Sequence, residues 1–280
     1  MKRLTLILVV CILLVGCSQG GSAVATIPTE ERAALTPTPS AETVREEIVF
    51  ELTLTPQAPT PTIEITPEPT ATPDPFFGLN VSFYGADSNF YHIDLDQMTR
   101  QRITGMSYPA EGAIITYDDL RYVHILYVDF EGQTHEGELI VNEQDANEVM
   151  DIFYQLYLAE YPLSSVKLVD DYGEPFEDNL SMAANNTSAF NYRYSSANKL
   201  SRHAYGAAID INPMMNPYIH SDGRVSPSNA ADWVDRSDVR VGMIDKNDLC
   251  YQLFTSYGWE WGGNFRSEKD YQHFSKDLGY

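Results

Sequence analysis

Hydrophobic and polar positions divide the chain into an apolar N-terminal run, a long polar stretch and a mixed C-terminal region. The run from Leu4 to Val15 is almost free of polar residues and follows the basic pair Lys2 and Arg3. It is too short to span a bilayer as a stable helix. The pattern therefore predicts a secretory signal peptide over residues 1–16.

Residues 17–78 show no periodic apolar face. Ten of the sixteen prolines lie between Pro28 and Pro75, in a stretch that is also rich in threonine. This composition predicts a disordered or polyproline-like tether. The part whose composition changes, residues 18 to 75, has about 58 residues and would reach about 180 Å at most if it were extended at ~3.1 Å per residue. Such a tether suits a target at a distance from the membrane; the alternative is a spacer with no specific reach.

Residues 79–280 are predicted to form the folded domain. Two strand-like runs, rich in aromatic and β-branched residues, flank Gly132 within residues 121–142 and predict an antiparallel hairpin. Asn142 then caps a helix, and Asp145, three positions later, completes a capping box. The apolar face of this helix is predicted to comprise Val149, Ile152, Phe153 and Leu156.

A second helix is predicted to begin near Asp245, with Asp248 completing its capping pair, and to end at Gly258. Ile244 and Leu249 have the spacing of a hydrophobic staple. Strands and helices are mixed without a regular alternation, so the sequence predicts an α+β fold, a small antiparallel sheet with flanking helices in a single domain. The apolar face of the second helix comprises Cys250, Leu253, Phe254 and Tyr257.

The charge balance fits an exported protein. Loss of Lys2 and Arg3 with the leader lowers the formal net charge from −22 to −24. Such a surface does not suit nucleic acid or anionic lipid as a partner. Of the three cysteines, Cys250 alone lies within the predicted domain, so we expect no intramolecular disulfide there.

The leader ends in Leu14-Val15-Gly16-Cys17, which resembles the lipobox of bacterial lipoproteins. The resemblance implies cleavage before Cys17 and lipidation of its thiol. The alternatives are an ordinary signal peptide or an uncleaved anchor. We therefore expect an extracytoplasmic protein that is anchored to the bacterial membrane by lipid and faces the cell wall, with a monomer as the default oligomeric state.

His203 and Asp210 are seven positions apart, and both are residue types that bind zinc. A straight strand would separate them by about 23 Å, at ~3.3 Å per residue. A helix would separate them by about 10.5 Å along its axis. Neither geometry lets them share a metal, so the chain must turn, and Gly206 supplies the turn before a short strand that carries Asp210. The spacing alone is common in unrelated chains.

The segment "GWEWGGNFRSEKDYQHFS" adds a second pattern, in which Asp270 precedes His273 by three residues. A carboxylate at this spacing can reach the same point as the imidazole. If His273 binds a metal, Asp270 can accept a proton from the attacking water. The alternative interpretation of Asp270 is a solvated charge.

Together, "SRHAYGAAIDINP" and "WGGNF…DYQHF" resemble the zinc peptidases that cleave bacterial cell-wall peptides. That family includes D-alanyl-D-alanine carboxypeptidases and L-alanyl-D-glutamate endopeptidases, and its fold is also that of Hedgehog-like domains. The pattern S-x-H-x-x-G-x-A-x-D runs from Ser201 to Asp210, and acid-x-x-H from Asp270 to His273. The endopeptidase branch also shows N-T-S-A-F-N-x-R, here residues 186–193.

The resemblance implies a role for each of these residues. Asp270 would be the general base and proton donor, and Arg193 would stabilise the oxyanion or hold the substrate carbonyl. The alternative for Arg193 is a surface ion pair. Zn²⁺ would be held by His203, Asp210 and His273. The resemblance also suggests substrate contacts by Ser201 and Tyr205.

The predicted function is hydrolysis of peptidoglycan stem peptides, as an L-alanyl-D-glutamate endopeptidase. An aspartate rather than a glutamate at position 270 favours that branch. The alternatives are a D-alanyl-D-alanine carboxypeptidase and a non-catalytic zinc-binding wall module. No H-E-x-x-H motif is present, because Leu139 stands where the second histidine after His135 would fall. We expect the long insert Met214–Ile244 to border the cleft.

Overall fold

The computed structural model describes residues 76–195 and 199–279. The predicted leader, Cys17 and the tether up to residue 75 lie outside the described residues. Within the described ranges, no helix is both long enough and apolar enough to cross a membrane.

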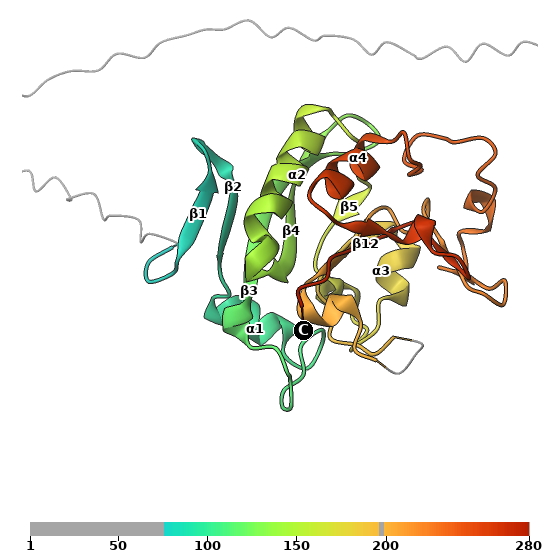
Figure 1. Cartoon of the computed structure of the whole chain (residues 1–280). Coiled ribbons are helices and arrows are strands. Elements are labelled where there is room, and N and C mark those ends of the chain that lie inside the picture. The colour runs from blue at the N-terminus through green and yellow to red at the C-terminus, as the bar shows by residue number, and fades with distance from the viewer. Residues whose placement is uncertain (1–75, 196–198, 280) are drawn as a thin grey trace, which may run out of the picture. The chain divides into compact units, whose positions relative to one another are not determined.

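A four-stranded antiparallel sheet occupies the N-terminal half of the described region, in the order β1-β2-β3-β4 (Figure 1). Its central hairpin joins β3 to β4 through a turn in which Gly132 adopts a φ of 76°, a conformation that favours glycine. The predicted hairpin is therefore confirmed. The strands are β1 (Val81–Tyr84), β2 (Asp87–Asp94), β3 (Leu120–Val128) and β4 (Thr134–Asn142).

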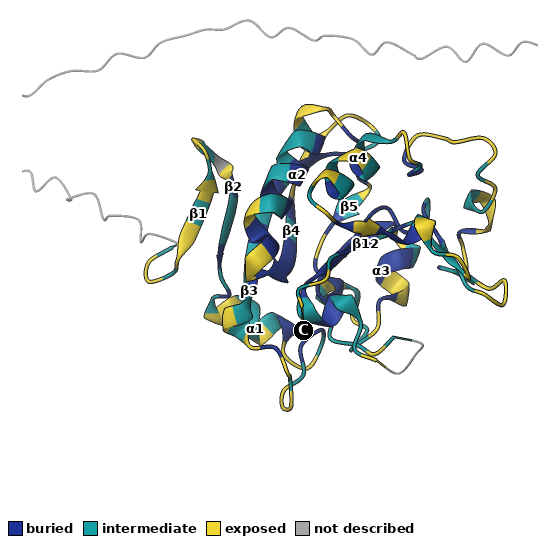
Figure 2. Cartoon of the chain, in the orientation of Figure 1, coloured by how far each residue is buried: buried dark blue, intermediate teal, exposed yellow. Residues whose placement is uncertain are grey.

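Helix α2 (Ala146–Leu158) covers one face of this sheet and packs mainly on β3 (Figure 1). The four residues predicted to form its apolar face are at most 1% exposed. They belong to the main hydrophobic core, which also contains Val123 and Leu139 from the sheet and Phe274 from the C-terminal region. Figure 2 shows the corresponding division of α2 into a buried and a more exposed side.

The predicted capping box at this helix is wrong in one part. Asn142 does cap, but it caps a short 3-10 turn, η2 (Glu143–Asp145), by accepting a hydrogen bond from the backbone N of Gln144 at 3.1 Å. Asp145 makes no side-chain cap hydrogen bond. The inserted turn places Asp145 at the start of α2, where it is buried and forms an ion pair with Lys276 at 3.3 Å.

The second predicted helix, α4 (Leu249–Ser256), begins later than expected. Asp248 is its N-cap and accepts a hydrogen bond from the backbone N of Cys250 at 2.8 Å. Asp245 instead accepts a hydrogen bond from the backbone N of Asn247 at 2.8 Å, which holds the preceding residues in a turn. Gly258 follows the helix with a φ of 84°, as predicted.

The C-terminal half contains two small antiparallel sheets. One has the order β10-β12-β7, from β10 (Glu260–Trp261), β12 (His273–Ser275) and β7 (Ala208–Asp210). The other has the order β11-β8-β9, from β11 (Lys269–Asp270), β8 (Tyr218–Ile219) and β9 (Val225–Ser226). A parallel pair joins β5 (Ser165–Val166) to β6 (Asn186–Thr187).

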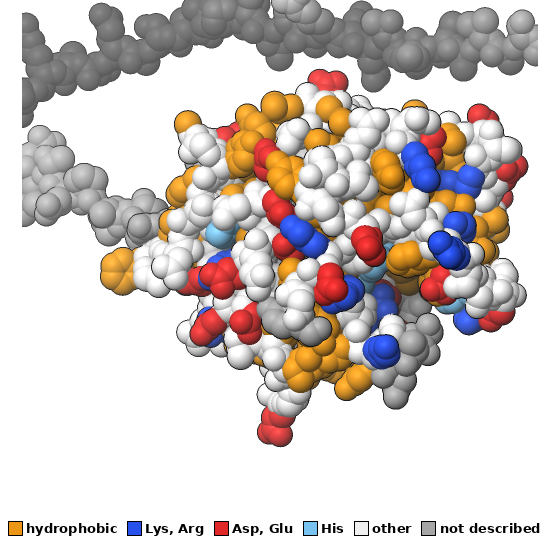
Figure 3. Space-filling view, in the orientation of Figure 1, with side chains coloured by type: hydrophobic (Ala, Val, Ile, Leu, Met, Phe, Trp, Pro, Cys, Tyr) orange, Lys and Arg blue, Asp and Glu red, His pale blue; other side chains and the backbone are white. Residues whose placement is uncertain are grey.

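Short helical segments connect these strands. Two are α-helices, α1 (Gln97–Ile103) and α3 (Asn179–Ala183). The remaining ones are 3-10 turns: η1 (Tyr117–Asp119), η3 (Val169–Tyr172), η4 (Arg202–Tyr205), η5 (Ala231–Trp233) and η6 (Gly262–Asn264). The mixture of helices and small antiparallel sheets confirms the α+β class. On the face shown in Figure 3, acidic and basic side chains are interspersed.

Candidate metal centre

Two of the predicted ligands come from neighbouring strands. β7 and β12 pair antiparallel with Asp210 directly opposite His273 and Ile209 opposite Phe274. Because side chains alternate along a strand, Asp210 and His273 project from one face while Ile209 and Phe274 are fully buried on the other. His273 Nδ1 lies 3.0 Å from Asp210 Oδ1.

The third ligand, His203, comes from the 3-10 turn η4. Ser201 caps this turn by accepting a hydrogen bond from the backbone N of His203 at 3.3 Å. Gly206 ends it with a φ of 67°, and its carbonyl accepts a hydrogen bond from the backbone N of Asn142 at 2.9 Å. A Cβ at position 206 would lie 2.6 Å from that nitrogen, so only glycine fits. The predicted turn at Gly206 is confirmed.

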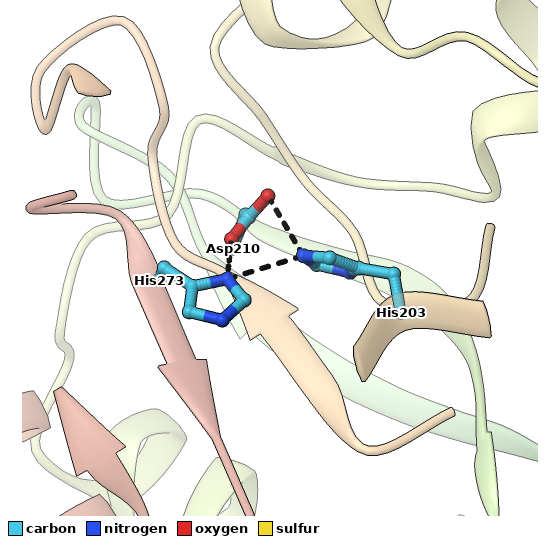
Figure 4. Close-up of side chains that lie close together, drawn as sticks. All are labelled: His203, Asp210 and His273. Carbon is cyan, nitrogen blue, oxygen red and sulfur yellow. Dashed lines mark hydrogen bonds and ion pairs between the residues drawn. The ribbon is translucent and has the colours of Figure 1, made fainter. Parts of the chain in front are cut away.

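The His203 imidazole is oriented by its own hydrogen bond. Nδ1 donates to the carbonyl of Ala189 at 2.5 Å, which directs Nε2 toward the other two ligands and makes it the ring nitrogen available to a metal. Nε2 lies 3.2 Å from Asp210 Oδ2 and 3.2 Å from His273 Nδ1 (Figure 4).

These three residues form a donor set that fits zinc. Their ligand atoms all lie within 4.8 Å of one another, and His203 and Asp210 are buried. Two imidazole nitrogens and one carboxylate oxygen are ligands that a catalytic zinc takes, with a position left open for water. Two neutral imidazole lone pairs would repel at 3.2 Å, so a proton or a cation between them is required.

The electrostatics of the cluster also favour a cation. Burial opposes ionisation of Asp210, but His203 and His273 outweigh burial and hold the pKa of this carboxyl well below its usual range. Burial disfavours the charged form of His203, yet the Asp210 carboxylate outweighs it and raises the pKa of the imidazole. Without a metal, protons therefore occupy the cluster, and a divalent cation would displace them.

Gln272 supports the Asp210 carboxylate, a role that sequence reasoning missed. Its side chain is buried, and Nε2 donates to Asp210 Oδ2 at 3.3 Å. The Asp210 carboxylate is thus held from two sides, by Gln272 and by the histidines. The position of Gln272 beside His273 was the only sequence feature that pointed to it.

Asp270 lies in β11, where it pairs with Tyr218 of β8. Its Oδ1 is buried and has no hydrogen-bond partner among the described residues. Burial, reinforced by the negative charge of Asp210, raises the pKa of Asp270 to about 7, although His273 and Arg193 act in the opposite direction. Asp270 is therefore a half-buried residue with one fully buried carboxyl oxygen, and it can exchange a proton near neutral pH.

A glycine fixes the position of Asp270. A Cβ on Gly262 would lie 2.7 Å from Asp270 Cβ and 2.4 Å from the Asp270 carbonyl oxygen. No larger residue fits this contact without moving β11. The first glycine of the "WGG" motif therefore serves to bring the turn η6 against the strand that carries Asp270.

Arg193 forms an ion pair, but within the site rather than on an open surface. Its Nη2 and Nε donate to Asp178 Oδ2 at 2.7 and 3.0 Å. Among the described residues, Asp178 thus takes two of the five N–H groups of the guanidinium, which leaves donors to face a substrate. Sequence reasoning did not identify Asp178, which precedes the 186–193 segment and belongs to none of the motifs.

These residues line one cavity of about 490 Å³, which we call the metal cavity. The insert 214–244 contributes to its wall, as expected, through Tyr218, His220 and Ser226. His220 Nε2 lies 2.9 Å from Ser226 Oγ, an arrangement that the sequence did not predict. Other lining residues include the three ligands, Asp270, Arg193, Asp178, Gln272 and Ser201.

Tyr205 lies elsewhere than expected for a substrate contact. Its ring packs against a second hydrophobic cluster, which includes Leu120 and Phe190, and it is not among the residues that line the metal cavity. Its carbonyl accepts a hydrogen bond from Asn142 Nδ2 at 3.0 Å. The structure thus brings Ser201 to the cavity and directs Tyr205 toward the core.

A family model described as D-alanyl-D-alanine carboxypeptidase matches residues 195–276. The matched segment contains all three ligands and Asp270, whereas Arg193 and the 186–193 segment precede it. The search of curated proteins and the search of solved structures find no match. The family match confirms the resemblance to the zinc carboxypeptidases and endopeptidases, and it supports a peptidase that acts on peptidoglycan.

Proposed function

We propose that the protein is a zinc metallopeptidase that cleaves the L-alanyl-D-glutamate bond of peptidoglycan stem peptides. The observation that carries this proposal is the convergence of His203, Asp210 and His273 in one cavity with Asp270 and Arg193. We further infer that the domain shares the fold of the zinc peptidases that its motifs resemble.

Each residue contributes a defined part of the reaction. A zinc ion held by the three ligands would supply Lewis acidity at the scissile carbonyl and increase the acidity of water. Asp270 takes a proton from the attacking water and later delivers it to the leaving amine, a role typically worth 10²–10⁴-fold in rate. Arg193 stabilises the negative charge that develops on the carbonyl oxygen.

D-alanyl-D-alanine carboxypeptidase is the second candidate. The description of the matching family favours it, and so do Lys199 and Arg202, which line the metal cavity and carry charges that suit a terminal carboxylate. The aspartate at position 270 favours the endopeptidase. A zinc-binding module without catalysis is the third candidate, and the presence of both Asp270 and Arg193 in the cavity argues against it.

Mass spectrometry of purified peptidoglycan digested by the zinc-loaded protein distinguishes these candidates. The endopeptidase produces fragments with a new N-terminal D-glutamate. Release of free D-alanine instead would identify the carboxypeptidase. Absence of any cleavage by a protein that binds zinc would support the non-catalytic module.

We also propose that the protein is held at the outer side of a bacterial membrane by a lipid on Cys17 and works as a monomer on the wall. Cys17 lies outside the described residues, so the proposal depends on the lipobox resemblance. Labelling of cells with a fatty acid tests it. We expect label on the wild type and none on the variant Cys17→Ser.

A further inference from the structure

A second cavity of about 450 Å³ adjoins the metal cavity. Arg193 and Glu177 line both cavities, so the two hollows meet at these two residues, one of which is proposed to hold the substrate carbonyl. The remaining walls of this second cavity are apolar or aromatic and come from Pro109, Phe176, Tyr192 and Tyr194. We call it the aromatic cavity.

The aromatic walls are held by backbone hydrogen bonds. The backbone N of Tyr192 donates to the carbonyl of Ser107 at 2.8 Å, and its hydroxyl accepts from the backbone N of Ile114 at 3.1 Å. Tyr194, two residues along, is 62% exposed. Tyr192 is therefore a fixed wall of the cavity, whereas Tyr194 lines the cavity and presents most of its surface to solvent.

Phe176 occupies a backbone conformation that is unfavourable for a large side chain. Its φ is 58°, in the left-handed region that favours glycine, and its backbone N donates to the carbonyl of Met106 at 2.8 Å. Strained residues of this kind concentrate at binding sites, where the surrounding structure maintains them. The ring of Phe176 is thus kept at the cavity despite the cost to the backbone.

The roles proposed for Arg193 and Asp270 indicate which part of the substrate lies on which side of the site. Arg193 holds the carbonyl oxygen, which belongs to the acyl part of the substrate. Asp270 delivers a proton to the leaving amine, and its strand β11 pairs with β8 of the insert, which carries Tyr218. The amine part therefore extends toward the insert, and the acyl part extends past Arg193 into the aromatic cavity.

We propose that the aromatic cavity binds the acyl part of the substrate, namely L-alanine with the lactyl group and amino sugar to which it is linked. This inference rests on the proposed endopeptidase function. Aromatic rings suit the methyl groups of alanine and lactate and the apolar face of a sugar ring. Glu177 provides a carboxylate that can accept hydrogen bonds from sugar hydroxyls.

Hydrolysis of two substrates tests the proposal. One is N-acetylmuramyl-L-alanyl-D-glutamyl-diamino acid, and the other is the same peptide with a free N-terminal L-alanine. We expect the wild type to prefer the first by about tenfold or more in kcat/KM. The variant Tyr194→Ala should lose most of this preference, whereas Tyr194→Phe should retain it. The control is Phe77→Ala, which removes another exposed ring, outside both cavities, and should retain the preference.

A binding measurement provides a readout that does not depend on turnover. Calorimetry compares two zinc-loaded proteins, the variant Asp270→Asn and the double variant Asp270→Asn with Tyr194→Ala. The double variant should bind N-acetylmuramyl-L-alanine about tenfold more weakly than the single variant. Equal kcat/KM for the two substrates, or an unchanged preference in Tyr194→Ala, would contradict the proposed role of the aromatic cavity. Neither result would contradict the proposed endopeptidase function. Failure to cleave either substrate would overturn the proposed function itself.

Discussion

At the scale of single residues, the site depends on how burial tunes Asp270. As the proposed general base, Asp270 would act in its ionised form, and burial raises its pKa to about 7 in the metal-free protein. A cation beside it favours ionisation and shifts the pKa downward. Activity should therefore rise with pH as Asp270 loses its proton, and the inflection should lie at or below about pH 7.

The variant Asp270→Asn tests this assignment. The amide cannot accept the proton of the attacking water, so kcat should fall by about 10²–10⁴-fold. Zinc content, measured on the purified protein by elemental analysis, should remain equimolar because Asp270 is not one of the three converging ligands. Retention of the wild-type kcat and pH profile would exclude Asp270 as the base.

Gln272 allows a prediction about metal affinity. Its Nε2 hydrogen bond to Asp210 Oδ2 orients a ligand without contacting the metal. Loss of a partner of this type typically weakens metal binding by about 10–100-fold. Competition with a chelator should show this loss in Gln272→Ala. Gln252→Ala, on the exposed side of α4, is the control with unchanged affinity.

At the scale of elements, local sequence patterns predicted the hairpin and the helices. The short strands of the site depend instead on pairing between segments that are distant in the sequence. The β3–β4 hairpin and α2 are encoded by alternation and periodicity within short windows. The strands that build the site are two or three residues long, and β7 pairs with β12 across more than sixty positions. No window contains both partners, so only the motif resemblance indicated that they meet.

The same reasoning explains which site residues were missed. The three ligands belong to motifs with fixed spacing and were predicted as a set. Asp178 and His220 line the metal cavity but belong to no motif. The insert that contains His220 was expected to border the cleft, but its sequence did not indicate which of its residues would do so. The late start of α4 has a local cause, because Asp245 forms its own turn and leaves Asp248 to cap the helix.

The 3-10 turn η4 supplies a test at this scale. Gly206 and Gly223 both have left-handed backbone conformations, but a Cβ at Gly206 would collide with the backbone of Asn142, whereas a Cβ at Gly223 would enter open space. Gly206→Ala should therefore lower the free energy of unfolding by about 1–3 kcal/mol and also weaken zinc binding. Gly223→Ala should cost about 1 kcal/mol and leave zinc affinity unchanged. Denaturant titration with and without zinc measures both effects.

At the scale of the whole molecule, zinc should act as a stabilising ligand. The three ligands come from two strands and a turn, and the unfolded chain does not hold them together. A free zinc concentration of one hundred times Kd should add about 2.7 kcal/mol to the free energy of unfolding. Thermal unfolding should show a higher midpoint with zinc. His273→Ala should lose most of this shift, and an equal shift in that variant would place the metal elsewhere.

The cross-strand pairing of Asp210 with His273 has a consequence for synthesis and secretion. A nascent chain that has exposed residues up to 272 presents only two ligands, and β12 has not yet joined β7. For a chain that crosses a membrane unfolded, metal capture then waits until position 273 has emerged on the far side. If the proposed export is correct, the protein would acquire its metal only outside the cell that makes it, and it would be inactive before that point.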